Sequence, residues 1–272
     1  MALIVPRLVA TDLDGTLVRS DGTVSERSCA VLRELARRGV HVVLVTGRPF
    51  RRVRKVAAEL QLSGVAICAN GALLYDLERD TVLEQTLLSA EVAHALIRQL
   101  RESLPEICFA VESGRSVGRE PGYAGRRPAR DGAERDIGHT VEIADAIELS
   151  ARGASKLIAL HPDLPIDEFF EKVREIVKDR ASVTHAGSPF LEIAAAGVTK
   201  AWALAAHCAK LSIEASQVIA FGDMPNDLPM LEWAGQGIAV ANAHPSVLAA
   251  ASAVTASNDE DGVAAHLERY LD

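Results

Sequence analysis

Two aspartates at the end of a short apolar run are the residues of this chain best placed to do chemistry. The run over residues 8–10 leads into Asp12 and Asp14 and stops at Gly15. Residues i and i+2 of a strand point to the same side, so the two carboxylates face one spot. Two anions held together repel each other unless a cation or a reaction uses them. The pair therefore predicts a divalent metal and an acid–base or nucleophilic task, whereas an Asp-Gly dipeptide alone would be typical of a surface turn.

Further polar signals occur downstream, and most of them follow apolar runs in the same way. They are Thr46-Gly47-Arg48 after residues 40–45, Asn70 after residues 65–68, Lys200 at the start of a helical pattern, and Gly222-Asp223-x-x-Asn226-Asp227 after residues 217–221. A lone Thr or Lys is normally a solvated surface residue. The order and the repeated position at strand ends are what make this set a candidate site.

The elements that must position these residues alternate between strands and helices. A helix is expected over residues 25–38, with Ser25 as its N-cap and Gly39 just beyond its end, and a second helix runs from Pro49 to residue 60. The apolar runs at 40–45 and 65–68 are the intervening strands. Repeated strand–helix–strand units predict a parallel sheet with helices on both faces, and ligands bind such sheets beyond the carboxyl ends of the strands.

The texture changes from about residue 75, which indicates a second domain inserted into the first. A turn at 77–80 and a strand at 81–85 precede a helix over 89–103, and residues 113–138 are rich in Gly, Pro and Arg, which predicts a loop. Three strands follow, at 156–160, 182–184 and 190–193, and a further helix is expected over 167–178. The first pattern then returns with helices at 198–211 and 262–270 and strands at 217–221, 237–240 and 253–255.

Bulk composition narrows the class of protein. The 272 residues suffice for two domains, and 49% hydrophobic with only 4% aromatic residues suits an α/β fold with a buried sheet. A net charge of −8 argues against nucleic acid as a partner. No apolar run approaches the length of a membrane span, and neither a basic leader nor paired cysteines are evident, so a cytoplasmic location is expected.

The motifs in their order and spacing resemble the haloacid dehalogenase-like (HAD) hydrolases. DLDGTL, VVLVTGR, GVTKAWAL and FGDMPNDLPML resemble the four motifs of that family, and NGA, IAVANAHPSV and SNDEDGVA resemble its Cof-type (IIB) sugar-phosphatase branch. The resemblance covers the core nearly end to end, and the inserted segment only in length and placement. It implies a three-layer Rossmann-like α/β core with a parallel sheet, formed by residues 1–75 and 196–272, and an α/β cap over residues 76–195.

The resemblance also implies a role for each motif residue in phosphoryl transfer. Asp12, the first aspartate off the strand, would be the nucleophile, and Asp14 would protonate the leaving oxygen and then deprotonate the attacking water. Thr46 and the amide of Gly47 would hold the transferring phosphoryl group, while Lys200 balances its charge. Asn70 and Asn226 are expected to contact phosphate or substrate.

A dianionic ester approaches two carboxylates only with a hard cation, and Mg²⁺ prefers oxygen ligands. By resemblance, the ligands are the side chain of Asp12, the backbone carbonyl of Asp14 and the side chain of Asp223. Asp227 is expected to orient these groups without touching the metal. For Asp223 and Asp227 the competing interpretation is simple capping of a helix N-terminus.

Several residues keep two interpretations. Arg48 either reaches the substrate or pairs with an acidic residue of the core. The arginines between residues 115 and 135 lie either in a solvated loop or over the polar end of the substrate. Glu192 either contacts a sugar hydroxyl or occupies an ordinary edge position. Asn258 and Asp261 are expected to brace the loops of the site.

The sequence thus predicts a Mg²⁺-dependent phosphatase that acts on small phosphomonoesters such as sugar phosphates, as a monomer or homodimer. The alternatives are a sugar phosphomutase of the same superfamily and a non-catalytic binding module. Cap residues that would select the substrate match no motif, so the ester itself is not predicted.

Overall fold

The computed structural model describes residues 5–114, 116–126 and 141–271. Its chain forms two compact units, Met1–Glu84 with Thr199–Asp272 and Gln85–Val198. The second unit is inserted into the first, as the sequence predicts. Each unit has its own sheet and its own apolar core.

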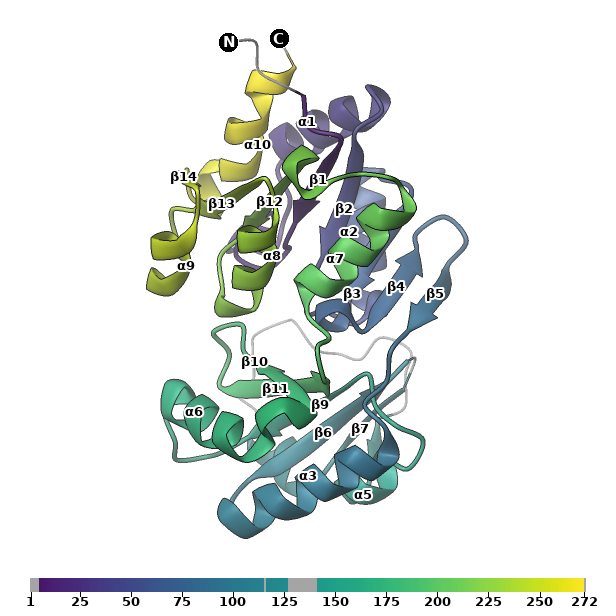
Figure 1. Ribbon diagram of the computed structural model, residues 1–272, viewed down its shortest axis with the longest axis vertical. Helices are drawn as coiled ribbons and strands as arrows, with labels where there is room; N and C mark the ends of the chain where they lie inside the picture. Colours follow the sequence, from purple (N-terminus) through teal and green to yellow (C-terminus); the bar gives the residue numbers. More distant parts are fainter. Residues whose placement is uncertain (1–4, 115, 127–140, 272) are drawn as a thin grey trace. The chain divides into compact units, whose positions relative to one another are not determined.

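The first unit is built on an eight-stranded sheet in the order β14-β13-β12-β1-β2-β3-β4-β5 (Figure 1). Its six strands from β14 to β3 run parallel, and β4 is antiparallel to β3. The strand bounds are β1 Leu8–Thr11, β2 His41–Val45, β3 Val65–Cys68, β4 Leu73–Asp76, β5 Thr81–Gln85, β12 Val218–Gly222, β13 Gln236–Val240 and β14 Ala253–Thr255. From β1 the chain winds outward in one direction to β3, and after the insertion β12 pairs with the other side of β1. The strand order therefore reverses beside β1, which is the place where ligands bind in such sheets.

Helices cover both faces of this sheet, so the first unit has three layers. One group consists of α7 Lys200–Lys210, α8 Leu228–Trp233 and α9 Pro245–Ala250; the other consists of α1 Glu26–Arg37, α2 Phe50–Leu60 and α10 Gly262–Leu267. Leu8 and Ala10 of β1 share a core with Leu204 of α7 and Met230 of α8. Because side chains alternate along a strand, Val9 faces the other layer and is also fully buried. The predicted three-layer α/β core is confirmed.

The helix ends agree with the sequence signals that predict them. The Ser25 side chain accepts a hydrogen bond from the Ser28 backbone N–H, and Gly39, just past the helix, has a φ of 86°. Pro49 precedes α2 as its N-cap rather than standing at the first helical position.

In the described part of the chain, no helix is both long and apolar enough to cross a membrane.

The second unit contains a six-stranded sheet in the order β10-β11-β9-β6-β7-β8. Its strands are β6 Cys108–Ser113, β7 Ser116–Arg119, β8 Glu142–Ile143, β9 Lys156–Leu160, β10 Ala181–Thr184 and β11 Phe190–Ala195, and its helices are α3 Ala90–Ser103, α4 Pro121–Arg126, α5 Ala146–Leu149 and α6 Ile166–Val177. Side chains of α3, α5 and α6 form one buried cluster with alternate residues of the sheet, such as Phe109 and Leu157. The helix and the three strands predicted between residues 156 and 193 are present within three residues of their expected bounds.

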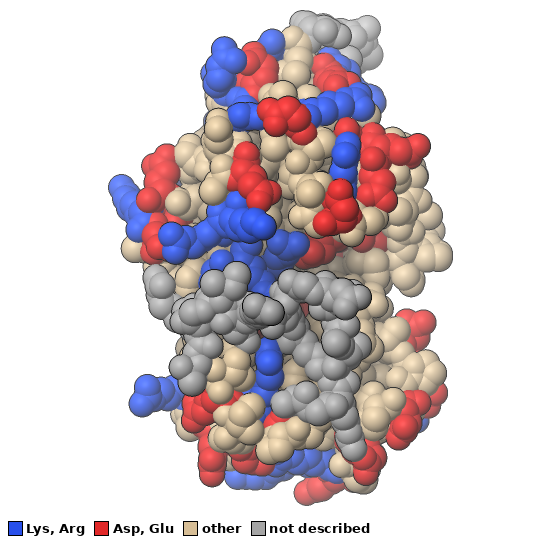
Figure 2. Space-filling view, turned by 180° about the vertical axis from the view of Figure 1, so that it is seen from behind, with Lys and Arg blue, Asp and Glu red and all other residues tan. Residues whose placement is uncertain are grey.

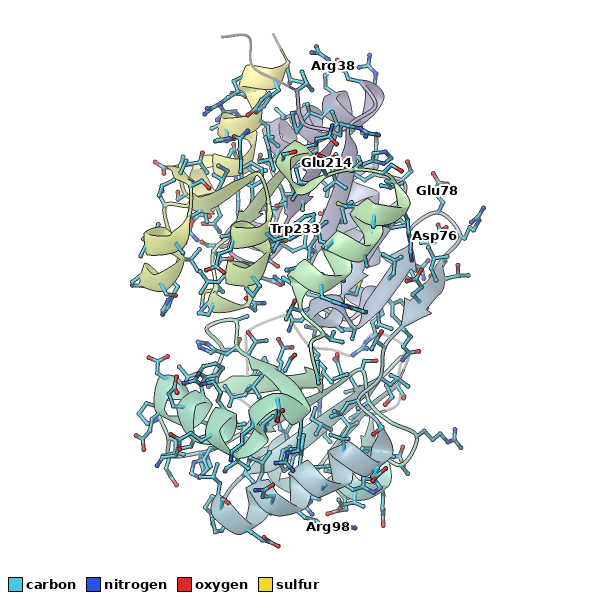
Figure 3. All side chains as sticks on the ribbon, in the orientation of Figure 1. Arg38, Asp76, Glu78, Arg98, Glu214 and Trp233 are labelled. Carbon is cyan, nitrogen blue, oxygen red and sulfur yellow. The ribbon has the colours of Figure 1, made fainter. Side chains whose placement is uncertain are left out.

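The unit boundary predicted after residue 75 is wrong, and the return to the core lies at Thr199 instead of residue 196. Strand β4 hydrogen-bonds to β3, and β5 extends the same sheet, so this hairpin belongs to the first unit. Asp76 forms the turn between the two strands, since its carboxylate accepts hydrogen bonds from the backbone N–H groups of Glu78 (2.9 Å) and Arg79 (2.8 Å). Figure 3 shows Asp76 and Glu78 at this hairpin.

The loop predicted over residues 113–138 is also wrong in its first part. Strand β7 pairs antiparallel with β6, and α4 follows it. Val117 and Tyr123 are buried there, and the Glu120 carboxylate accepts hydrogen bonds from the backbone N–H groups of Phe109 (2.7 Å) and Ala146 (3.2 Å). These buried groups are scattered among Gly, Pro and Arg, so they produce no apolar periodicity.

The described surface carries acidic and basic side chains of both signs side by side (Figure 2). Exposed ion pairs account for part of this mixture, for example Arg27 with Glu268 at 2.6 Å. Such pairs contribute little to stability individually. Several charged residues are instead buried, among them Asp12, Lys200 and Asp227.

Candidate active site

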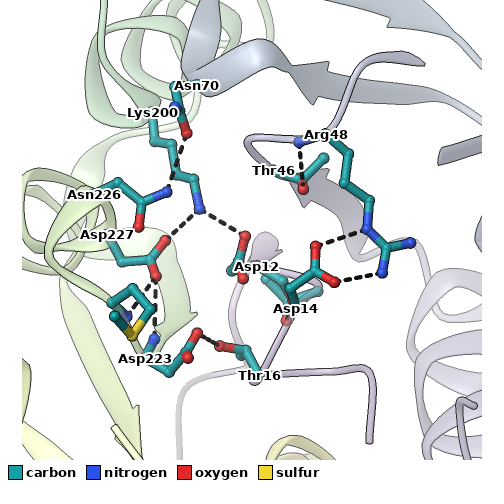
Figure 4. Close-up of polar contacts among 12 residues, drawn as sticks. Asp12, Asp14, Thr16, Thr46, Arg48, Asn70, Lys200, Asp223, Asn226 and Asp227 are labelled. Carbon is teal, nitrogen blue, oxygen red and sulfur yellow. Dashed lines mark hydrogen bonds and ion pairs between the residues drawn. The ribbon is translucent and has the colours of Figure 1, made fainter. Parts of the chain in front are cut away.

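Predicted residues from all four motifs lie together at the carboxyl ends of β1, β12 and the strands beside them (Figure 4). Asp12 follows β1 directly, and its backbone N–H donates to the carbonyl of Phe221 in β12 (3.0 Å). This bond continues the pairing of the two strands by one residue. It places Asp12 beside Asp223, which follows β12. The Asp12 side chain is buried, although a carboxylate is normally exposed.

Lys200 compensates the buried negative charge of Asp12. The Lys200 Nζ donates to Asp12 Oδ1 and to Asp227 Oδ1, both at 2.6 Å, and the lysine is almost entirely buried. Burial lowers the pKa of Lys200, but the two carboxylates outweigh it and raise the pKa above its ordinary value. This lysine is therefore a fixed cation at neutral pH.

Local geometry explains how Lys200 comes to this position. It is the first residue of α7, and the N-cap Thr199 side chain accepts from the Trp202 backbone N–H at 3.0 Å. The loop after β3 packs tightly against this helix start: a Cβ on Gly71, whose φ is +103°, would lie 2.3 Å from the Thr199 carbonyl oxygen. Only glycine allows the two segments to approach this closely.

Asp223 is held by the first motif. Thr16 Oγ1 donates to Asp223 Oδ1 at 2.7 Å, and a Cβ on Gly15 (φ +80°) would lie 2.3 Å from Asp223 Oδ2. Burial and the neighbouring Asp227 raise the pKa of Asp223 to about 7. Thr16 belongs to the DLDGTL motif, but its contact with Asp223 is not predicted from the sequence.

Asp227 is fully buried, and both of its oxygens are engaged within the protein. Oδ1 accepts from Lys200, and Oδ2 accepts from the backbone N–H groups of Asp223 and Met224, each at 3.1 Å. A Cβ on Gly222 would lie 2.4 Å from the Asp227 Cβ. Asp227 thus ties the loop after β12 to Lys200.

One oxygen each from Asp12, Asp223 and Asp227 lies within 4.8 Å of the others. Burial, the largest cause, raises the pKa of Asp12 well above its ordinary value; Lys200 opposes this effect, and the three neighbouring aspartates reinforce it. Clustered carboxylates whose ionisation is disfavoured in this way form a site that a divalent cation would stabilise. The oxygen donors fit a hard cation such as Mg²⁺.

Asp14 points away from this cluster and pairs with Arg48. Arg48 Nε lies 2.7 Å from Asp14 Oδ2, and Nη2 lies 2.5 Å from Asp14 Oδ1. The Asp14 side chain is 61% exposed and the Arg48 side chain 22%. Of the two interpretations of Arg48, this structure shows the pairing with an acidic residue.

The loop after β2 carries three predicted residues. The Thr46 backbone N–H donates to the Ile67 carbonyl (2.8 Å). Thr46 Oγ1 accepts from the Arg48 backbone N–H (3.0 Å), and Gly47 lies between these two residues in the chain. Thr46 is buried. The hydroxyl therefore stabilises the turn by which the chain leaves β2.

The loop after β3 brings Asn70 to the site in a left-handed backbone conformation, with a φ of 55°. Its backbone N–H donates to the Thr46 carbonyl (3.0 Å), and its Oδ1 accepts from Asn226 Nδ2 (3.1 Å). Asn226 Oδ1 is buried with no hydrogen-bond partner among the described residues. Buried amide oxygens are normally paired, so this atom is a candidate acceptor for a ligand group.

A polar network braces the segment that follows Asp14. Asn242 Nδ2 donates to the Gly15 carbonyl (2.8 Å), and Asn258 Nδ2 donates to the Val18 carbonyl (3.0 Å). Asp261 pairs with Arg19 (2.7 Å). The bracing predicted for Asn258 and Asp261 is observed, and Asn242, which lies in the IAVANAHPSV segment, was not predicted.

The second unit holds the remaining predicted residues. Glu192 in β11 is buried and forms a hydrogen bond and ion pair with Lys156 of β9, which also lies 3.5 Å from Glu112 of β6. Its position is therefore not an exposed edge. Arg119 lies in β7, whereas residues 115, 127, 130 and 135 lie outside the described residues.

Known proteins resemble this chain over nearly its whole length. Residues 9–267 match the model of a family described as haloacid dehalogenase-like hydrolase. The chain is 29% identical over 265 residues to the 5-amino-6-(5-phospho-D-ribitylamino)uracil phosphatase YcsE of Bacillus subtilis, covering 97% of this chain and 96% of that protein. It is 27% identical over 270 residues to the HMP-PP phosphatase of Serratia proteamaculans, covering 97% and 95%.

A solved structure has a similar fold. The solved structure of the HAD subclass IIB sugar phosphatase BT4131 superposes with a TM-score of 0.81 at 19% identity, covering 97% of this chain and 98% of that one. The expected enzyme class therefore agrees with the family model and with the named phosphatases, and the expected fold agrees with the solved structure. This chain belongs to the haloacid dehalogenase-like hydrolase family.

Proposed function

We propose that this protein is a Mg²⁺-dependent phosphatase that hydrolyses small phosphomonoesters through an aspartyl-phosphate on Asp12. The observation that carries the proposal is the buried group of Asp12, Lys200, Asp223 and Asp227 at the carboxyl end of β1. A nucleophile, a fixed cation and a set of oxygen donors meet there. Phosphoryl transfer needs an in-line nucleophile and neutralisation of the phosphate charge.

Asp12 is the nucleophile in this proposal. One carboxylate oxygen attacks phosphorus, the bond from phosphorus to the ester oxygen breaks, and the departing alkoxide takes a proton from Asp14. Water then attacks the phosphorus on Asp12 and gives a proton to Asp14. The bond between phosphorus and the Asp12 oxygen breaks, which regenerates the carboxylate and releases inorganic phosphate. The hydrogen bond from Lys200 to Oδ1 holds the Asp12 carboxylate in one orientation.

Asp14 serves as the acid and then the base. The Asp14 side chain is 61% exposed, which fits a group that must give a proton to the departing alkoxide and take one from water. A phospho-enzyme with such a group beside it is short-lived.

Lys200, Thr46 and the Gly47 amide would stabilise the charge of the transferring group. Asn226 Oδ1 and the paired Asn70 would contact the substrate. Asp12, Asp223 and the Asp14 backbone carbonyl would hold Mg²⁺, and Asp227 would orient them, because both of its oxygens are already engaged. When bound, the metal supplies positive charge that offsets the carboxylates and the phosphate.

The substrate class is a small phosphorylated metabolite such as a sugar phosphate. The named relatives act on a phosphoribityl compound and on HMP-PP, and the subclass IIB structure is a sugar phosphatase. We place the choice of leaving group in the inserted unit, Gln85–Val198.

A phosphate-release screen tests the proposal. The purified chain is incubated with a panel of sugar phosphates, other alkyl phosphates and 4-nitrophenyl phosphate, with Mg²⁺ or with EDTA. Release is expected from several esters with Mg²⁺, and it should stop with EDTA or in the Asp12→Asn variant. If no ester of the panel released phosphate in the presence of Mg²⁺, the proposal would be wrong.

A further inference from the structure

Both the backbone and the side chain of Arg48 form hydrogen bonds within the protein. Its backbone N–H donates to Thr46 Oγ1, and its carbonyl accepts from the Ala69 backbone N–H, both at 3.0 Å. The side chain leaves this fixed point and directs two nitrogens at the two oxygens of Asp14 (2.7 and 2.5 Å). Figure 4 shows the two parallel hydrogen bonds.

This geometry is the two-point pairing that only arginine makes. A planar guanidinium matches both oxygens of a carboxylate and so fixes its rotation as well as its position. Asp14 needs such a restraint, because its side chain is 61% exposed and is not packed in the core. An exposed carboxylate without a partner would rotate among several rotamers.

The pairing also links two motifs. Asp14 follows β1, whereas Arg48 follows the neighbouring strand β2, and the register pairs the two strands directly. The orientation of Asp14 is thereby set by the turn that also carries Thr46 and Gly47, residues that the proposed function assigns to phosphoryl binding.

We infer that Arg48 is a positioning residue for proton transfer: it fixes the rotation of the Asp14 carboxylate instead of binding the substrate phosphate. This inference rests on the proposed function. It replaces the expectation that Arg48 contacts the substrate. Misplacement of a catalytic group by about 1 Å can lower a rate by about 100-fold, so the loss of this restraint should be measurable.

The test compares two kinds of ester in the Arg48→Gln variant. One is 4-nitrophenyl phosphate, whose nitrophenolate departs without a proton. The other is the alkyl phosphate that the wild type hydrolyses fastest in the panel, and its alkoxide does require a proton. If Arg48 acts through Asp14, kcat/KM for the alkyl ester should fall at least about tenfold more than kcat/KM for the aryl ester.

Binding of the phosphate by Arg48 predicts a different result. Both esters carry the same phosphate, so kcat/KM would fall by the same factor for both, mainly through KM. That result would overturn the inference. An unchanged kcat/KM for both esters would overturn it as well.

Three further variants complete the experiment. Asp14→Asn supplies the reference pattern, with its larger loss on the alkyl ester. Arg48→Lys keeps the charge but cannot form two parallel hydrogen bonds, so it should restore less than half of the lost kcat on the alkyl ester. Arg54→Gln removes another arginine–aspartate pair of the same unit (Arg54 with Asp80, 2.8 Å) and should leave both esters unaffected.

The two proposals fail in different ways. A wild type that hydrolyses neither ester would contradict the proposed function itself. A wild type that hydrolyses both, with equal losses on the two esters in Arg48→Gln, would contradict only the role of Arg48. Thermal unfolding of each variant shows whether a loss of activity reflects loss of the fold.

Discussion

At the scale of single residues, the site is a balance of buried charges. Lys200 lies between Asp12 and Asp227 at 2.6 Å from each, and Asp223 adds a third carboxylate beside them. Burial, reinforced by the neighbouring carboxylates that one lysine does not fully neutralise, raises the pKa values of Asp12 and Asp223. In the metal-free protein these carboxylates repel one another, and a divalent cation bound among them would reduce that repulsion.

This repulsion predicts how stability depends on pH. The pKa of Asp223 rises from an ordinary 3.8 to about 7 in the folded protein. Between these values the folded state binds a proton that the unfolded state has lost, so the free energy of unfolding of the metal-free protein should fall as pH rises through this window. The slope from Asp223 is at most about 1.4 kcal/mol per pH unit.

The measurement is thermal or urea unfolding in EDTA and in Mg²⁺. Mg²⁺ competes with protons for the same carboxylates, so it should raise the melting temperature more at about pH 8 than at about pH 5. Asp223→Asn should flatten the slope, whereas Glu78→Gln, which removes an exposed charge of the same unit, should leave it unchanged. Equal stabilisation by Mg²⁺ at both pH values would contradict this account.

At the scale of elements, the site depends on close contacts between loops and helix ends. Gly71 in the loop after β3 lies against Thr199, the N-cap of α7, which carries Lys200. The position of the lysine is thus set by backbone packing as well as by its charge. A glycine in a short NGA segment predicts a turn, but not the partner against which it packs.

Substitution of this glycine should damage both the fold and the site. Gly71→Ala combines an unfavourable φ of +103° with a collision with the Thr199 carbonyl, and it should lower the free energy of unfolding by about 2–4 kcal/mol. It should also lower kcat, because the start of α7 must shift.

Gly22→Ala is the matched control. Its φ is +84°, yet a Cβ there would meet nothing within 4 Å, so only the backbone strain remains, about 1 kcal/mol. Its kcat should equal that of the wild type. Equal losses of stability in the two variants would contradict the role assigned to the contact between Gly71 and Thr199.

The elements also show what could be predicted from the sequence. Asp12, Thr46, Asn70 and Asp223 follow buried strands whose apolar runs are plain, and in a parallel sheet those ends lie together. Asn242 was missed, because nothing in its neighbourhood in the sequence indicates that its amide reaches the Gly15 carbonyl. Strand β7 was missed because its buried Val117 and Gly118 lie between Ser116 and Arg119. The apolar run at the start of β6, Cys108 to Val111, was a usable strand signal that was not taken up.

At the scale of the whole molecule, two units with separate cores share one chain. The proposed metal ligands lie in Met1–Glu84 and Thr199–Asp272, whereas Phe169, Val173 and Leu191 belong to the core of Gln85–Val198. Proteins with several domains often depart from two-state unfolding. A substitution in the core of Gln85–Val198 should therefore destabilise that unit, whereas the metal should stabilise the other unit.

Phe169→Ala tests this separation. Its side chain is 1% exposed, and removal of a buried phenylalanine ring costs about 3–5 kcal/mol. Hydrogen exchange followed by mass spectrometry should show faster exchange within residues 85–198, with the other unit protected as in the wild type. Mg²⁺ should slow exchange around β1 and β12 in both proteins. Faster exchange throughout the chain would instead indicate a single cooperative unit.

Detection of phosphate on Asp12 is the measurement that tests the central claim most directly. Asp14→Asn removes the base that activates water, so the phospho-enzyme formed from 4-nitrophenyl phosphate should accumulate and persist through acid quenching. Mass spectrometry of the digested protein should find one added phosphoryl group, on Asp12. Asp12→Asn,Asp14→Asn should show none under the same conditions. Phosphate release by Asp14→Asn at the wild-type rate, or a phosphoryl group on another residue, would contradict the account.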